Sequence, residues 1–154
     1  MPGYRGHALG VFVMAIPLAF LGGWYGLGVL ELLQGLVFMF WGAFFPDVDT
    51  TGRGRRFFYA LLLLFILISL LMKSVLIAIC CTAVGLLASI SRHRGIFHNL
   101  YFLFFLTAAL CGWLVNVIPE FRLEVVWAGV FFFLGCFSHL FMDFGWRRTF
   151  AWRS

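Results

Sequence analysis

The chain has 154 residues, of which 64% are hydrophobic, 20% aromatic and 11% charged, and its formal net charge is +5. A soluble domain usually contains about 25% charged residues, so this composition excludes a water-soluble globular protein. It also excludes a soluble domain with one anchor, because the apolar character covers the whole length. We expect a single transmembrane helical domain over residues 1–154.

Charged and turn-forming residues divide the chain into apolar runs of the length that membrane helices need. In chain order these runs are residues 8–22, 26–45, 57–90, 97–117 and 125–144. A helix needs about 20 residues to cross the hydrocarbon layer, so the third run is too long for one crossing. Lys73 and Ser74 divide it into two short crossings, 57–72 and 74–90. We therefore predict an all-α, polytopic integral membrane protein with six transmembrane helices.

The first run has a second interpretation as a signal peptide, because Arg5 precedes its apolar core. The run has no clear A-x-A cleavage site, however, and His7 is one of the few polar residues on the predicted cytoplasmic side. We interpret it as the first membrane helix.

The distribution of basic residues supports six crossings independently. Six crossings place the N-terminus, the loops 46–56 and 91–95, and the C-terminal tail on one side of the membrane. Nine of the 11 basic residues fall on that side, and only Lys73 and Arg122 fall on the other. The positive-inside rule then predicts that both termini are cytoplasmic in a multi-pass protein of the cytoplasmic (inner) membrane. This layout explains the positive charge without a nucleic-acid partner.

The few other polar residues gather on the predicted cytoplasmic side. They include all four histidines and all three aspartates of the chain, namely His7, Asp47, Asp49, His93, His98, His139 and Asp143. His139 and Asp143 are four residues apart, so they share one helix face and can bind one ion. Asp47 and Asp49 follow the second helix in a Pro-initiated turn, and His98 opens the fifth helix. Imidazoles with carboxylates suit a divalent metal, zinc or manganese, and the number of candidates allows two ions.

Each of these residues also has a simpler interpretation on its own. A histidine at a helix end commonly forms an interfacial hydrogen bond, and the two aspartates of a turn commonly cap it. Asp143 could pair with Arg147 on the next turn of the same helix. Their convergence on one side of a chain with almost no other polar residues favours a metal site, because ionisable groups at membrane depth are functional candidates.

Over essentially its whole length the chain resembles the YdjM-like family of inner-membrane, metal-dependent hydrolases. The resemblance rests on four short motifs in the family's order, His7, Pro46-Asp47-x-Asp49, His93-Arg94-Gly95-x-x-His98 and His139-Leu140-x-x-Asp143. The family's H-R-G-x-T-H-S pattern has Phe97 in place of threonine and Asn99 in place of serine here. The family is also similar to zinc-dependent phospholipase C and nuclease folds, which implies phosphoester cleavage by analogy of fold.

From these motifs we expect a metal-dependent hydrolase that acts on a phosphoester, a lipid-like substrate drawn from the membrane, at the cytoplasmic interface. The expected metal ligands are Asp47, Asp49, His98, His139 and Asp143. His7 and His93 would be further ligands or the catalytic groups that transfer protons. The metal would lower the pKa of a bound water and neutralise charge on the phosphoryl oxygens.

Substrate binding would use basic and apolar residues near the ligands. Candidates to hold the phosphate are Arg53, Arg92 and Arg94, since a guanidinium can bind two oxygens at once. Orientation in the membrane and contact with lipid head groups explain these arginines equally well. The expected apolar walls are Phe97, Phe102, Phe141 and Phe144.

Three other functions have weaker support in the sequence. Ser91-Arg92 followed by His98 matches half of the motif of phosphatidic-acid phosphatases, but Phe102 stands where their aspartate belongs. A serine-type hydrolase would need a nucleophile beside a histidine. A metal or proton transporter, or a scaffold with a structural metal, is the non-enzymatic alternative, although transporters usually place their ligands near the midplane.

The topology can be tested with reporter fusions. Reporters after Arg56, after Arg94 and at the C-terminus should all show a cytoplasmic location, whereas one near Glu120 should show the opposite side, because basic loops remain cytoplasmic. Disagreement between the Arg56 and Arg94 reporters would show that residues 57–90 are not a hairpin.

Overall fold

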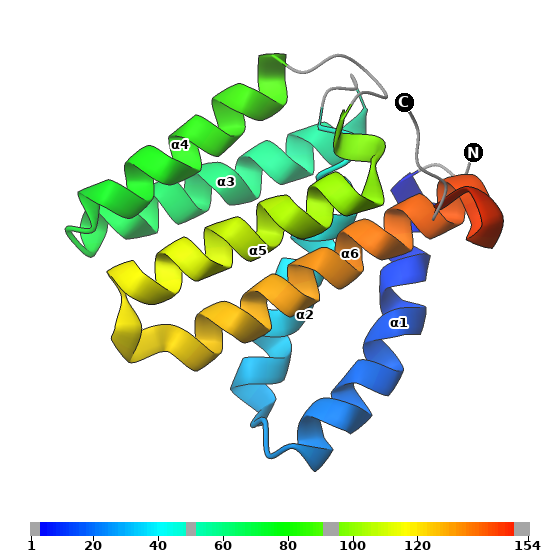
Figure 1. Ribbon diagram of the computed structural model, residues 1–154, viewed down its shortest axis with the longest axis horizontal. Coiled ribbons are helices and arrows are strands. Elements are labelled where there is room, and N and C mark those ends of the chain that lie inside the picture. Colours follow the sequence, from blue (N-terminus) through cyan, green and yellow to red (C-terminus); the bar gives the residue numbers. More distant parts are fainter. Residues whose placement is uncertain (1–3, 49–51, 91–95, 150–154) are drawn as a thin grey trace.

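The computed structural model describes residues 4–48, 52–90 and 96–149, and Figure 1 shows how they are arranged. The six α-helices are α1 (Tyr4–Trp24), α2 (Val29–Phe44), α3 (Arg53–Leu71), α4 (Val75–Ile90), α5 (Leu100–Val117) and α6 (Arg122–Thr149). Two short 3-10 turns, η1 (Ile96–His98) and η2 (Pro119–Phe121), precede α5 and α6. The described residues contain no strand, and the predicted all-α fold with six helices is confirmed.

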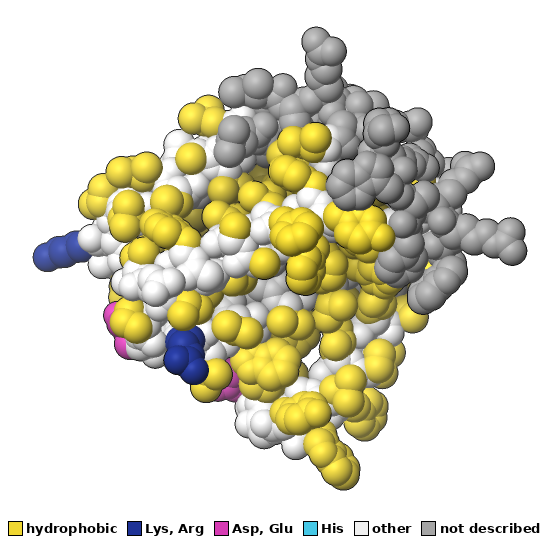
Figure 2. Space-filling view, in the orientation of Figure 1, with side chains coloured by type: hydrophobic (Ala, Val, Ile, Leu, Met, Phe, Trp, Pro, Cys, Tyr) yellow, Lys and Arg dark blue, Asp and Glu magenta, His cyan; other side chains and the backbone are white. Residues whose placement is uncertain are grey.

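The surface of the bundle is that of a membrane protein. Helices α1, α3, α5 and α6 are long and apolar enough to cross a membrane, and α2 and α4 are shorter apolar helices. Large apolar side chains are widely exposed, as Trp24 (88%) and Leu71 (81%) illustrate. Hydrophobic side chains cover much of the face in Figure 2, and the few charged ones in view lie near the end with the α3–α4 and α5–α6 connections. Lipid is the solvent that such a surface requires.

Alternate connections lie at opposite ends of the bundle, as six crossings demand. The α1–α2, α3–α4 and α5–α6 turns are at one end in Figure 1, and both termini are at the other. We call the second end, which also contains the turn after α2 and η1, the termini end. The predicted hairpin at Lys73 is confirmed: Lys73 adopts a left-handed conformation (φ 58°), and the Ser74 amide donates to the Ser69 carbonyl at 2.8 Å. This bond closes the C-terminus of α3 and reverses the chain.

Helices α2 and α6 form the closest and most extensive helix pair of the bundle. They cross at glycines, because a Cβ at Gly42 would clash with the carbonyl oxygen of Phe132, and one at Gly135 with that of Met39. Membrane helices lack a hydrophobic driving force between them and depend on such close contact. The residues next to the crossing, including Met39 and Cys136, are fully buried.

The importance of the crossing can be measured by adding one methyl group. Gly135→Ala should lower the free energy of unfolding in detergent by about 1–3 kcal/mol, because the two backbones must separate to make room. Gly112→Ala on α5 is the matched control, since nothing lies within 4 Å of a Cβ at that position. Equal stability of the two variants would show that the close approach of α2 and α6 is not required.

Candidate metal centre

Four segments that are distant in the sequence meet at the termini end of the bundle. His7 comes from the first turns of α1, Asp47 from the turn after α2, and His98 from η1. His139 and Asp143 come from the last turns of α6 before Gly145, where the helix breaks with φ 69°. Asp47, His98, His139 and Asp143 can each offer one ligand atom, and these four atoms all lie within 4.8 Å of one another.

Two local structures hold the loop ligands in place. After α2 the Val48 amide donates to the Phe45 carbonyl at 3.1 Å, and both side chains are buried, so the turn that contains Asp47 is anchored on either side. Before α5 the side chain of Asn99 accepts hydrogen bonds from the amides of Tyr101 and Phe102. Asn99 is therefore the N-cap of α5.

The cap corrects one detail of the sequence prediction. His98 was expected to open the fifth helix, but it lies in the 3-10 turn η1, and α5 begins at Leu100. Asparagine caps a helix about as well as serine does. Asn99, which stands where the family pattern has serine, therefore caps α5 without a hydroxyl.

His139 is oriented by the backbone of α2. Its side chain is completely buried, and its Nδ1 lies 2.7 Å from the carbonyl oxygen of Ala43. Because a carbonyl only accepts, Nδ1 is the protonated nitrogen that donates, and Nε2 faces the other ligands with its lone pair. Nε2 is buried and has no hydrogen-bond partner. A second-shell bond that fixes the tautomer and leaves the opposite nitrogen available is typical of a metal-binding histidine.

Three distances between neighbouring ligand atoms are longer than good hydrogen bonds and close to the spacing of ligands on one metal ion. The Nε2 atom of His139 lies 3.4 Å from Asp143 Oδ2 and 3.6 Å from Asp47 Oδ1, and His98 Nε2 lies 3.6 Å from the same Asp47 oxygen. Good N–H···O bonds are about 2.7–3.2 Å long. Ligand atoms about 2.0–2.1 Å from one tetrahedral ion lie about 3.3–3.4 Å apart. Two imidazoles and two carboxylates therefore form a group that can hold a divalent ion.

Asp143 connects this group to His7. One carboxylate oxygen of Asp143 faces His139, and the other lies 3.5 Å from His7 Nε2. The rings of His7 and His139 are stacked, with centroids 3.9 Å apart and planes at 11°. His7 is almost fully buried and is not one of the four grouped ligands. Its position suits either a further ligand or a group that exchanges a proton near Asp143.

Asp47 is the most exposed member of the group, with 30% of its side chain accessible. Burial by itself would raise the pKa of its carboxyl, but the interaction with His98 and, when the imidazoles are protonated, the charges of His139, His98 and His7 outweigh burial and lower that pKa below its ordinary value. Asp47 is therefore an anionic ligand at neutral pH. Among the four grouped residues, Asp47 is therefore the one most open to solvent.

Several predicted site residues are not in this group. Asp49, His93, Arg92 and Arg94 lie outside the described residues, so their expected functions stay predictions. Arg53 is the first residue of α3, and its side chain is exposed. The expectation of two ions is likewise untested, and the described residues contain one group of at least three such ligands.

The Ala43 carbonyl was missed by sequence reasoning, although it orients the central histidine. No signal in the sequence could have found it, since every residue has a carbonyl and only the crossing of α2 and α6 brings this one to His139. The Asn99 cap was also missed, but an asparagine directly before an apolar run is a recognisable helix start.

The fold and the ligand group define an α-helical, multi-pass membrane protein that can bind a metal ion. The chain belongs to the YdjM inner membrane protein family, whose model matches residues 1–152. It is therefore a protein of the inner membrane, as the sequence predicted. Neither the curated proteins nor the solved structures contain a match to the chain.

Metal binding can be tested on the pair from α6. His139→Ala should weaken metal binding by at least about tenfold, measured by titration against a competing chelator, because substitutions even outside the ligand shell cost about 10–100-fold in affinity. Asn116→Ala on α5 is the control, since that amide only bonds to its own helix at Gly112. Full occupancy in the His139→Ala/Asp143→Ala double variant would leave these residues a structural function only.

Proposed function

We propose that the protein is a metal-dependent hydrolase that cleaves a phosphoester of a membrane lipid at the cytoplasmic face of the inner membrane. The observation that supports this most strongly is the group of Asp47, His98, His139 and Asp143, in which all side chains but that of Asp47 are buried and neighbouring nitrogen and oxygen atoms are 3.4–3.6 Å apart. Such a group is expensive to place in a membrane protein unless an ion or a reaction uses it.

The location of the group supports a lipid substrate. All its members lie at the termini end, close to where α1 begins, α2 ends and α5 begins. A phosphate head group of a bilayer lipid is at that depth, whereas transporters usually place their ligands near the midplane. The adjoining N-terminus of α3 contributes Arg53, Arg55 and Arg56. Guanidinium groups there suit the binding of phosphate oxygens, although contact with neighbouring lipids would use the same charges.

Four residues of the site would bind the metal ion, and His7 would transfer a proton. Asp47, His98, His139 and Asp143 would hold a divalent ion, zinc or manganese, which supplies Lewis-acid polarisation of the phosphoester and makes water more acidic. The Ala43 carbonyl holds the His139 ring so that only Nε2 would be available to the ion. Asp143 lies between His139 and His7, so His7 Nε2 is placed to take up or release a proton beside the reacting groups.

Activity can be tested with the purified protein in micelles or bilayers. Lipid phosphoesters should release phosphate or a phosphorylated head group, and water-soluble phosphoesters should react much more slowly, because they lack the binding energy of the tail. Chelation should abolish the activity, and Asp47→Asn should lower kcat/KM by more than about 100-fold, since it replaces an anionic ligand by a neutral one.

The control for this experiment is again Asn116→Ala, which should retain full activity and fold like the parent protein. Unfolding curves of Asp47→Asn should match those of the parent protein without metal. A metal-loaded protein that hydrolyses no lipid phosphoester but moves the ion across a vesicle membrane would replace the hydrolase proposal with a transporter.

A further inference from the structure

The helix that carries His139 and Asp143 breaks shortly after these two ligands. Gly145 has φ 69° and ψ 173°, a conformation that is essentially restricted to glycine, and a short helical turn, residues 146–149, follows it. In Figure 1 the red segment at the end of α6 bends away from the axis of the helix before it. The break comes two residues after Asp143, so this ligand lies in the last turn before the break.

Thr149 connects the segment after the break to the helix before it. Its side-chain hydroxyl donates to the Gly145 carbonyl oxygen at 2.8 Å and to the Leu140 carbonyl oxygen at 3.2 Å, so its one proton is shared between them. In an uninterrupted helix residues 140 and 149 would be roughly 13.5 Å apart along the axis. The bond to Leu140 therefore exists only because the chain turns back at Gly145. Thr149 and Leu140 are both buried.

Asp143 lies in the chain between the two carbonyls that Thr149 bonds. His139 is oriented by the Ala43 carbonyl, but Asp143 has no comparable partner. Over the described part of the chain its polar neighbours are His7 and His139, at 3.5 and 3.4 Å, and its buried Oδ1 has no hydrogen-bond partner. Carboxylates that bind metals are generally hydrogen-bonded themselves. The direction of this carboxylate therefore depends on the backbone of its own helical turn.

One side of that turn is open to the surroundings. Phe141 and Met142 are exposed, and so is Gly145. Helix ends fray, and a frayed last turn would move Asp143 away from the other ligands. The Thr149 hydroxyl restrains this turn at both ends, because Leu140 precedes Asp143 by three residues and Gly145 follows it by two.

We propose that Thr149 is a positioning residue of the metal site. Its hydroxyl, bonded to the Leu140 and Gly145 carbonyls, holds the last turn of α6 so that the Asp143 carboxylate faces the other ligands. This inference rests on the metal group of the proposed function, but it does not require that the protein hydrolyses anything.

The affinity for Co²⁺, titrated against a competing chelator in detergent, tests the position of the ligand without any reaction. Thr149→Val removes the donor and should weaken Co²⁺ binding by about tenfold, the lower end of the effects of residues that support metal ligands. Thr149→Ser keeps the hydroxyl and should bind Co²⁺ as the parent protein does. Thr82→Val on α4 is the matched control, since it removes a hydroxyl that donates to the Ala78 carbonyl at 2.8 Å, and it should leave the affinity unchanged.

The break itself can be tested with a pair of glycines. Gly145 and Gly26 both have a positive φ, and nothing lies within 4 Å of a Cβ at either position. Alanine should therefore strain the backbone at both positions and lower the stability of the metal-free protein. Gly145→Ala should also weaken Co²⁺ binding, whereas Gly26→Ala, in the α1–α2 turn at the opposite end of the bundle, should not.

A double-mutant cycle shows whether Thr149 acts through Asp143. In Asp143→Ala, which leaves three ligands of the group, Thr149→Val should cause no further loss of Co²⁺ affinity, because the residue that it positions is absent. The visible spectrum of bound Co²⁺, which reports ligand geometry, should change in Thr149→Val and return to that of the parent in Thr149→Ser. An equal loss of affinity in the Asp143→Ala background, or a Thr149→Val protein that is less stable but binds Co²⁺ as the parent does, would overturn the proposal.

The outcomes separate this proposal from the hydrolase. Weaker Co²⁺ binding in Thr149→Val that depends on Asp143, in a protein that hydrolyses no lipid, would support the positioning residue and reject the hydrolase. Metal-dependent lipid hydrolysis with equal affinity in the parent and Thr149→Val would support the hydrolase and reject the positioning residue. A parent protein that binds no Co²⁺, Zn²⁺ or Mn²⁺ would reject both.

Discussion

The crossing of α2 and α6 at Gly42 and Gly135 is the contact on which the metal group depends. Because each backbone lies where a side chain would otherwise be, the carbonyl of Ala43 comes within 2.7 Å of His139 Nδ1. Through this bond the contact between the two helices fixes the tautomer of His139. The packing of the bundle therefore determines which nitrogen of His139 faces the other ligands. In a bilayer, where glycine interfaces replace hydrophobic collapse, the scaffold and the site are thus one structure.

The sequence predicted the parts of the fold that depend on solvent and on local spacing. Run lengths and the position of Lys73 predicted six helices with a hairpin, and the four-residue spacing of His139 and Asp143 predicted their shared face, where the structure has them 3.4 Å apart. The pairing of α2 with α6 could not be predicted, since every helix of the chain is mostly apolar and a glycine has no preferred partner. The stacking of His7 on His139 follows only once that pairing is known.

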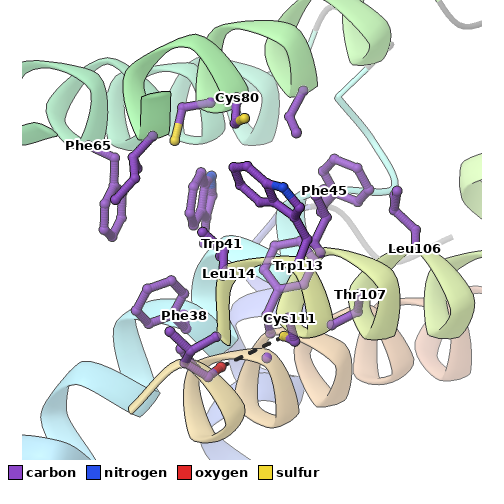
Figure 3. A pocket seen from close by; sticks show the side chains of 18 of the residues that line it. Phe38, Trp41, Phe45, Phe65, Cys80, Leu106, Thr107, Cys111, Trp113 and Leu114 are labelled. Carbon is purple, nitrogen blue, oxygen red and sulfur yellow. Dashed lines mark hydrogen bonds between the residues drawn. The ribbon is translucent and has the colours of Figure 1, made fainter. Parts of the chain in front are cut away.

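The same limit applies to the apolar cavity of about 330 Å³ that residues of α2 to α6 line (Figure 3). Aromatic residues next to the ligands, such as Phe97 and Phe144, were the natural candidates for apolar walls, because the sequence reports proximity along the chain. In the structure Phe97 lies in η1 and packs against Phe45, and His98 and Phe144 lie edge to face. The cavity arises where α4 packs along α3 rather than α5. A cavity between helices forms where neighbouring helices are not in contact. No pattern of residues in the sequence predicts which helices those are.

The ligand group lies at the termini end of the bundle, and the apolar cavity lies deeper between the helices. At the termini end the ligands are buried except on the exposed side of Asp47, so water and a charged group can approach from one direction only. Deeper in the bundle, the cavity that α2 to α6 line is almost wholly apolar. Under the proposed function, a substrate that suits both surroundings is anionic at one end and apolar at the other. A membrane lipid with a phosphate in its head group has this form, which is why the proposed substrate is a lipid phosphoester.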